Sequence, residues 1–355
     1  MTTVDSSPRA RSRRRGLAVS ATLILLTWGT WTGAMVAGGR WHLFADGWPM
    51  SLTMALGSFV AGATSEGGGA VAFPVMTLVL GIEPGVARDF SLMIQSVGMT
   101  SAAAAILLSG IRVERRAIGW ASLGGALGLV IGLEWLADLF VPSYAKMFFT
   151  SVWLSFAVAL WLINRYHERE VHREIVGFLP RHAAMLVAAG VAGGLVSSIT
   201  GSGLDITIFA LLVLRLRINE KIATPTSVVL MAGNSLTGFL WKGGVRGTLS
   251  PEAWDAWWVC VPIVVIGAPI GAWFIERRSR LFVSGILSTA IVVQSVVAFL
   301  IVPQSVPLLA FSAAVFLAGT TFFRFLAARG VRRLEWLGAV GAAGGGSPEG
   351  GSGVP

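Results

Sequence analysis

Apolar runs of about 20 residues recur along most of this chain of 355 residues. A helix needs roughly 20 consecutive, mostly apolar residues to cross the hydrocarbon core of a bilayer, so these runs predict membrane-spanning helices. Charged residues make up 13% of the chain, about half the share found in soluble globular domains. A transmembrane β-barrel would instead need short strands of alternating hydrophobicity. The sequence therefore predicts an all-α polytopic membrane protein.

The net charge of +9 would suggest a nucleic-acid partner in a soluble chain. Here the basic residues lie in short loops between apolar runs, where they indicate membrane topology. The single cysteine, Cys260, has no partner for a disulfide, and the four histidines show no metal-ligand spacing. We therefore expect no nucleic-acid partner, no cofactor and no metal site.

The N-terminus carries five arginines between Arg9 and Arg15, followed by an apolar stretch from Leu17 to about Ala37. This pattern fits either a signal or twin-arginine leader or an uncleaved membrane helix. The apolar stretch is long for a leader, and the residues near Gly38 make a poor cleavage site, so we favour the uncleaved helix. In both cases the chain emerges on the outside near Arg40.

Two apolar stretches, Met50–Gly81 and Ala183–Leu214, are about 32 residues long, which is too long for one ordinary span. Glycine-rich sequence interrupts each of them near the middle, and we expect arms of about 12–16 residues on both sides of each break. The remaining predicted spans are Phe90–Leu108, Ala117–Leu139, Tyr144–Leu162, Ile222–Trp241, Trp254–Ile275, Leu281–Val302 and Ser305–Leu326.

Two topologies compete, because each broken stretch either crosses the bilayer or enters and returns as a re-entrant hairpin. Crossing would put the basic clusters Arg112–Arg116 and Arg165–Arg173 outside, against the positive-inside rule. With hairpins, 22 of the 27 basic residues fall on the cytoplasmic side. The outside keeps Arg40, Arg88, Lys146, Lys242 and Arg246. This distribution favours hairpins, with both termini cytoplasmic in a multi-pass protein of the cytoplasmic membrane.

Three spans follow each hairpin, so the two hairpins should enter from opposite faces and meet near the middle of the bilayer. The expected segments are a basic N-terminus (1–16), an extra helix and outer loop (17–48), repeat 1 (49–164), a cytoplasmic linker (165–181), repeat 2 (182–303), an extra helix (304–327) and a disordered cytoplasmic tail (328–355). Broken helices at corresponding positions of inverted repeats are typical of secondary transporters.

A glycine triplet followed by apolar residues and proline, Gly67 to Pro74, carries a family resemblance. So does the Ala-x-x-x-Ser pattern from Ala87 to Ser91, and a weaker copy of both recurs in the second half. With these motifs the chain resembles the sulfite exporter family, TauE/SafE, over about residues 50–302. The resemblance implies transport of sulfite, sulfonates and related organosulfur anions. The chain departs from the family pattern with Glu66 before the triplet, and with Gly201-Ser202-Gly203 followed by Asp205.

Helices that begin at the two breaks would present unpaired backbone N–H groups to an anion, and glycine would let the anion approach the backbone. Hydroxyl and amide side chains nearby would add donors. In the alternative interpretation, the glycines at the breaks only permit close helix packing. The expected substrate-binding residues are Ser65, Glu66, Gly67, Gly68, Gly69, Ser91, Gln95, Thr200, Gly201, Ser202, Gly203, Thr224, Ser227 and Asn234.

Glu66 and Asp205 are the acids nearest the breaks, and an ionisable group at that depth indicates function by default. A carboxylate beside an anion should be protonated when the anion is bound, so both are candidates for proton coupling. Capping of the following helix is the alternative for Glu66, with equal weight, and the favoured interpretation for Asp205. Arg88 and Asp89 are expected to be solvated at the outer mouth.

These features predict a secondary transporter of small anions that works by alternating access, with protons as a further candidate partner. An anion channel on the same scaffold remains open as an alternative, because a gated midplane site and a conducting one share these features. Direct ATP drive is unsupported, since the sequence has no P-loop motif. An enzyme is not expected, and the sequence does not define the oligomeric state.

Overall fold

The computed structural model describes residues 8–64, 69–164, 172–276, 278 and 280–344. Within these ranges the chain folds into twelve α-helices, and its only β-type pairing is an isolated bridge between His172 and Ile218. Seven of the described helices are long and apolar enough to cross a membrane. The prediction of an all-α, multi-pass membrane protein is therefore confirmed.

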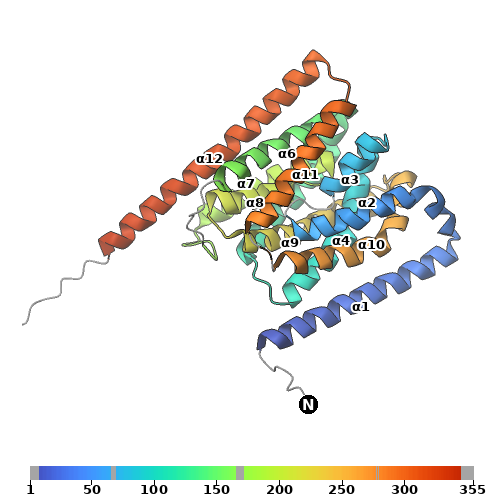
Figure 1. Ribbon diagram of the computed structural model, residues 1–355, viewed down its shortest axis with the longest axis horizontal. Helices are drawn as coiled ribbons and strands as arrows, with labels where there is room; N and C mark the ends of the chain where they lie inside the picture. The colour runs from blue at the N-terminus through green and yellow to red at the C-terminus, as the bar shows by residue number, and fades with distance from the viewer. Residues whose placement is uncertain (1–7, 65–68, 165–171, 277, 279, 345–355) are drawn as a thin grey trace, which may run out of the picture.

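The helices follow one another along the chain (Figure 1). They are α1 (Pro8–Ala37), α2 (Leu43–Ala63), α3 (Gly69–Pro74), α4 (Pro84–Leu108), α5 (Arg115–Trp135), α6 (Pro142–Asn164), α7 (Pro180–Thr200), α8 (Leu204–Ala210), α9 (Glu220–Phe239), α10 (Pro251–Glu276), α11 (Arg280–Ile301) and α12 (Val306–Gly344). Single π-helical segments extend α3, α8 and α9: η2 (Val75–Val79), η4 (Leu211–Arg215) and η5 (Leu240–Val245).

Both broken stretches turn back on themselves. A Cβ at Gly57 of α2 would lie 3.3 Å from the Cβ of Val71 in α3, so α3 returns along α2. In the second stretch, a Cβ at Gly193 of α7 would lie 2.7 Å from the Cα of Leu204, the first residue of α8. The returning arm ends beside the segment that leads into α7, where the His172 N–H donates to the Arg217 carbonyl (2.7 Å).

The two arms of each hairpin are unequal, which corrects the expectation of two arms of 12–16 residues. The first arms, α2 and α7, have 21 residues each, or about 31 Å of helix. The returning arms, Gly69–Val79 and Leu204–Arg215, are about half as long. The sequence analysis expected residues 43–48 in an outer loop, whereas in the structure they form the start of α2. In the structure Pro49 lies inside α2.

The hairpins open toward opposite ends of the bundle. Lys242 in η5 forms an ion pair with Asp89 near the start of α4 (2.6 Å), so the loops before α4 and after η5 share one end, which we name the Asp89 end. Glu114 accepts from the Ile175 N–H (2.9 Å), so the loops before α5 and α7 share the other, the Glu114 end. The first hairpin runs into α4 at the Asp89 end, and the second runs into α9 at the Glu114 end.

Glycines allow the long hairpin arms to pack closely on their neighbours. Gly62 of α2 lies against the Ala268 carbonyl of α10, and a Cβ there would overlap that oxygen. Gly124 of α5 lies in the same way against the Val187 carbonyl of α7. Small residues at helix crossings let backbones approach, and dispersion then stabilises the pair in the absence of a strong hydrophobic effect. Each hairpin is thus held by a helix from the other half of the chain.

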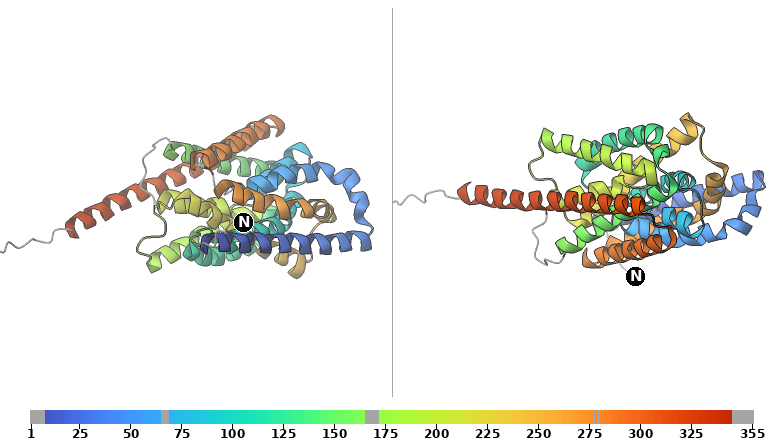
Figure 2. Two further views of the ribbon diagram at one scale, coloured as in Figure 1. Left: turned by 60° about the horizontal axis from the view of Figure 1, so that its bottom comes forward. Right: turned by 90° about the horizontal axis from the view of Figure 1, so that it is seen from above.

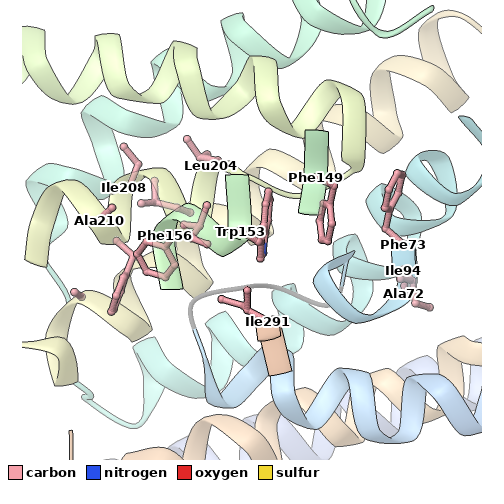
Figure 3. Packing of buried hydrophobic residues seen from close by; sticks show 14 of the residues in the cluster. Ala72, Phe73, Ile94, Phe149, Trp153, Phe156, Leu204, Ile208, Ala210 and Ile291 are labelled. Carbon is pink, nitrogen blue, oxygen red and sulfur yellow. The ribbon is translucent and has the colours of Figure 1, made fainter. Parts of the chain in front are cut away.

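An aromatic stripe on α6 joins the returning arms of the two hairpins (Figure 3). Phe149 lies 5.2 Å from Phe73 of α3 and stacks on Trp153 at 4.2 Å, measured between ring centroids. One turn further, Phe156 lies 6.0 Å from Phe209 of α8. Trp153 is fully buried in this core. α6 therefore connects the two hairpins through a continuous row of side chains.

The terminal helices flank this core (Figures 1 and 2). The described part of α1 begins at Pro8, well before the predicted start at Leu17. α12 continues to Gly344, past the predicted end at Leu326. The segment 328–344 is therefore helical, where we expected a disordered tail. Its alanines and leucines favour a helix.

Candidate functional site

The tip of the second hairpin spans residues 200–205 and depends on two glycines with positive φ. Gly201 has φ of 78° and Gly203 has φ of 155°, which L-residues with a Cβ rarely adopt. Thr200 fixes the turn by donating its hydroxyl to the carbonyl of Ser202 (2.6 Å). The whole segment is buried. These residues therefore place an irregular, polar backbone in the interior of the bundle.

The backbone N–H groups at this tip donate within the chain. Oδ1 of Asp205 accepts from the N–H groups of Gly203 (3.0 Å) and Ile206 (2.9 Å). Ser202 donates its hydroxyl to Oδ2 of Asp205 (3.1 Å), and the Leu204 N–H donates to Oγ of Ser197 (3.0 Å). Asp205 thus has the contacts of a capping carboxylate at the start of α8.

We expect Asp205→Asn to destabilise the protein by about 1–3 kcal/mol, because charge-assisted hydrogen bonds at a buried cap are lost. Thermal unfolding in detergent measures this, with Asp255→Asn, an exposed acid on α10, as the matched control. A variant of unchanged stability that loses the pH dependence of transport would instead support Asp205 as the proton-coupling group.

One face of α4 lies against this tip. A Cβ at Gly201 would come within 2.5 Å of the Ser91 Cβ and 2.8 Å of the Arg88 carbonyl. Gln95 donates its side-chain amide to the carbonyls of Gly201 and Ser91 (both 2.9 Å). The Ser91 hydroxyl itself donates to the Ala87 carbonyl (2.7 Å). The structure therefore brings the predicted residues Ser91 and Gln95 together with the predicted tip.

The predicted residues of α9 are all buried, but they do not all reach this tip. Asn234 lies beside it, because a Cβ at Gly125 would contact both Leu204 and Oδ1 of Asn234. Thr224 and Ser227 lie two to three turns closer to the Glu114 end, where Ser227 donates to the Thr224 carbonyl (2.8 Å). Only Asn234 from this helix thus joins Gln95 near the second tip.

The first tip falls largely outside the described residues. Ser65, Glu66, Gly67 and Gly68 lie there, Gly69 begins α3, and Thr64 before the break is buried and donates to the Val60 carbonyl (2.9 Å). α2 ends beside Ala268 of α10, one turn past Val265, whose carbonyl accepts from Ser101 of α4 (3.0 Å).

The described helix ends that lead into the two breaks lie at different depths. The first tip itself lies outside the described residues, so the expectation that the two tips meet stays a prediction. α7 ends beside Ser91 of α4, whereas α2 ends near the level of Ser101. Ten residues of helix separate these levels, or about 15 Å. Each long arm reaches past the middle of the bundle because it has 21 residues, so the helix ends lie at different depths.

A buried charged cluster lies next to the second tip. Asp89 accepts from Arg88 (2.9 Å) and from Lys242 (2.6 Å), and the side chains of these three residues are 5–13% exposed. The expectation that Arg88 and Asp89 are solvated is therefore wrong. Tertiary packing of α7 and η5 on the start of α4 covers them. On its outer side, Arg88 also pairs with the exposed Asp138 (3.7 Å), so Asp89 is the buried carboxylate of the cluster.

The sequence contains a signal that Arg88 belongs with the expected site residues. Arg88, Ser91 and Gln95 follow the spacing i, i+3, i+7, which puts them on one face of a helix. The predicted span began at Phe90, so Arg88 was assigned to a loop and not to that face of the helix. In the structure, α4 begins at Pro84, where proline fits the first helical turn.

Comparison with known proteins places the chain in a family. No curated protein and no solved structure matches it. The family model described as Sulfite exporter TauE/SafE matches residues 50–296, which hold both hairpins and the charged cluster. The chain therefore belongs to the TauE/SafE sulfite exporter family of membrane transporters.

Proposed function

We propose that this protein is a secondary transporter that moves sulfite, sulfonates or other small organosulfur anions across the cytoplasmic membrane. The observation that carries the proposal is the cluster of Arg88, Asp89 and Lys242, buried against the tip of the second hairpin. Arg88 also pairs with Asp138 (3.7 Å), but that carboxylate is 90% exposed and is screened by water. Among the buried groups, two cations therefore face one carboxylate, that of Asp89. A buried cation attracts an anion strongly because screening by water is weak there.

The tip supplies the polar surroundings that such an anion needs. Ser91 and Gln95 lie on the same face of α4 as Arg88. Because Gly201 has no side chain, its backbone contacts both of them. Thr200, Ser202 and Gly203 shape the same turn. We assign these residues and Asn234 to the substrate site on this side. The break at 65–69, with Thr224 and Ser227, is the proposed counterpart in the first half.

Alternating access requires two halves that rock against each other, and several contacts support inverted repeats. α2 packs on α10 through Gly62, and α7 packs on α5 through Gly124. The long arm of each hairpin therefore packs on the corresponding helix of the other half. The hairpins open toward opposite ends of the bundle. We assign the Glu114 end to the cytoplasm, because Arg112, Arg115 and Arg116 lie there.

Proton coupling through Glu66 remains a proposal from the sequence. Glu66→Gln is expected to abolish the pH dependence of anion uptake, because glutamine mimics the protonated acid, while anion binding stays measurable. The measurement is uptake into proteoliposomes under imposed pH gradients, with the exposed Glu252 of α10 changed to Gln as control. Unchanged pH dependence in Glu66→Gln would remove Glu66 from the coupling mechanism.

An anion channel on the same scaffold is the alternative. The discriminating experiment is a flux assay of purified protein in liposomes with sulfite, sulfoacetate, thiosulfate and a carboxylate control. Saturable flux with countertransport supports a carrier, whereas voltage-clamp currents far above a carrier's turnover support a channel. Absence of flux for every sulfur anion would contradict the proposed function.

A further inference from the structure

Two buried amide side chains near the second tip keep polar atoms without partners in the part of the chain that the structure describes. Oε1 of Gln95 accepts no hydrogen bond, and neither Nδ2 nor Oδ1 of Asn234 is bonded. Gln95 and Asn234 are each only 2% exposed. Buried polar groups are nearly always hydrogen-bonded, and an unmade bond there is costly. An occupant that is not part of the chain, a water molecule or a ligand, would satisfy these atoms.

The orientation of the Gln95 amide is fixed by its own contacts. Its Nε2 donates to two carbonyls, those of Ser91 and Gly201. If the amide were turned over, its oxygen would face both carbonyl oxygens, which is repulsive. Oε1 therefore points away from these carbonyls as a pure acceptor, and it needs a donor.

Gln95 and Asn234 lie at the same depth in the bundle. A Cβ at Gly238 of α9 would lie 2.9 Å from Cδ1 of Leu92 on α4, so the two helices touch there. α4 runs away from the Asp89 end and α9 runs toward it, since Lys242 after α9 meets Asp89 near the start of α4. Gln95 and Asn234 each lie about one turn further inside. Both flank the tip, Gln95 at Gly201 and Asn234 beside Leu204.

The unpaired atoms define the chemistry of their ligand. Asn234 offers a donor, which any oxyanion accepts, but Oε1 of Gln95 and Oδ1 of Asn234 offer acceptors. A fully deprotonated oxyanion has only acceptor oxygens, so it would leave Oε1 of Gln95 without a donor. Its negative oxygens would also repel the partial negative charge on Oε1. A ligand with an O–H group satisfies that oxygen. The nearby cluster of Arg88 and Lys242 compensates the ligand's remaining negative charge.

We propose that this site binds a singly charged sulfur oxyanion that carries a hydrogen-bond donor, namely hydrogen sulfite rather than the sulfite dianion. This proposal rests on the proposed anion transport. The hydroxyl of hydrogen sulfite donates to Oε1 of Gln95, and its charged oxygens accept from Asn234. No covalent step is involved. The site thus selects a protonation state of the ligand, independently of any proton-coupling carboxylate.

The test measures binding of total sulfite to the purified full chain between about pH 6 and about pH 9, with methanesulfonate as a donor-free probe. Above the pKa of hydrogen sulfite, its fraction falls tenfold per pH unit, so the apparent Kd for total sulfite should rise tenfold per unit. Methanesulfonate does not titrate in this range, and we expect it to bind at least tenfold more weakly than hydrogen sulfite.

Charged groups on the elements packed around this site enter both measurements equally. They are Arg88 and Asp89 on α4, Asp138 after α5, Asp205 on α8, Lys242 on η5 and Arg246 after it, Glu134 on α5, Lys146 on α6, Glu252 and Asp255 on α10, Asp46 on α2, and Glu114, Arg181 and His182 near the Glu114 end. The readout is therefore the Kd for total sulfite divided by the Kd for methanesulfonate at each pH, because titration of the protein cancels in this ratio. We expect the ratio to rise with pH, and a ratio that stays constant or falls would overturn the proposal.

Asn234→Leu provides a second test. Because the side-chain amide of Asn234 makes no hydrogen bond to the described chain, leucine of similar volume should leave the melting temperature unchanged or raised. Affinity for hydrogen sulfite should fall at least tenfold. The control is Ser235→Ala, a neighbour whose hydroxyl donates only to the carbonyls of Met231 and Ala232. Unchanged affinity with a lowered melting temperature would make Asn234 structural and contradict its role at the site.

The two proposals fail in different ways. If neither total sulfite nor methanesulfonate binds or is transported at any pH, the proposed anion transport is wrong. If methanesulfonate binds as tightly as hydrogen sulfite, anion transport stands and only the selection of a protonated ligand is wrong.

Discussion

Replacing Lys242 by glutamine is expected to lower sulfite transport by about ten- to a hundredfold, equivalent to about 1.4–2.8 kcal/mol. The lysine is half of the positive charge in the buried cluster, and its Nζ lies 2.6 Å from Asp89. Without it, Asp89 and the exposed Asp138 both face Arg88 alone, so the cluster no longer attracts an anion. The measurement is initial uptake of sulfite into proteoliposomes, corrected for the amount of folded protein.

A stability effect must be separated from this electrostatic one, because breaking a buried ion pair destabilises a protein by several kcal/mol. Asp89→Asn is the matched variant: it breaks the same pair but leaves the cluster with two positive charges. We expect it to lose stability yet to keep or improve anion affinity. If both variants lose affinity equally, the cluster is structural, and the observation that carries the proposed function is lost.

Gly201→Ala is expected to destabilise the protein by about 3–5 kcal/mol and to abolish transport. The positive φ of 78° costs an L-residue about 1–2 kcal/mol. Its Cβ would lie 2.5 Å from that of Ser91 and 2.8 Å from the Arg88 carbonyl, so the tip and α4 must separate. Thermal unfolding in detergent and uptake of sulfite measure the two effects.

Gly233→Ala on α9 serves as the control for a glycine that nothing crowds. The nearest atom to a Cβ there is the Ser122 hydroxyl, at 3.9 Å, and the backbone is helical. Alanine is the better helix former, so stability should stay equal or rise. A well-tolerated Gly201→Ala variant with normal transport would show that α4 does not need to contact this tip.

The apolar pattern was enough to predict the class of the protein and the existence of two broken stretches. The glycine interruptions near residues 67 and 201 gave correct positions for both breaks, because irregular backbone at this depth needs glycine and polar partners. Ser91, Gln95 and Asn234 were among the expected substrate-binding residues, and the structure places them near the second tip. The arm lengths were predicted wrongly, since hydropathy does not reveal that a helix continues through Pro49 or begins at Pro180.

The amino-acid sequence by itself determined that this chain enters a membrane, where its helices break and which family it belongs to. These properties depend on local composition, on glycine and on motif spacing, which are all read along the chain. Only the tertiary structure decided that Arg88, Asp89 and Lys242 form one buried cluster, that the long arms end at different depths, and that Gln95 and Asn234 share a level. Burial and pairing depend on contacts between residues more than 100 positions apart, and the energy of a charge depends on that burial.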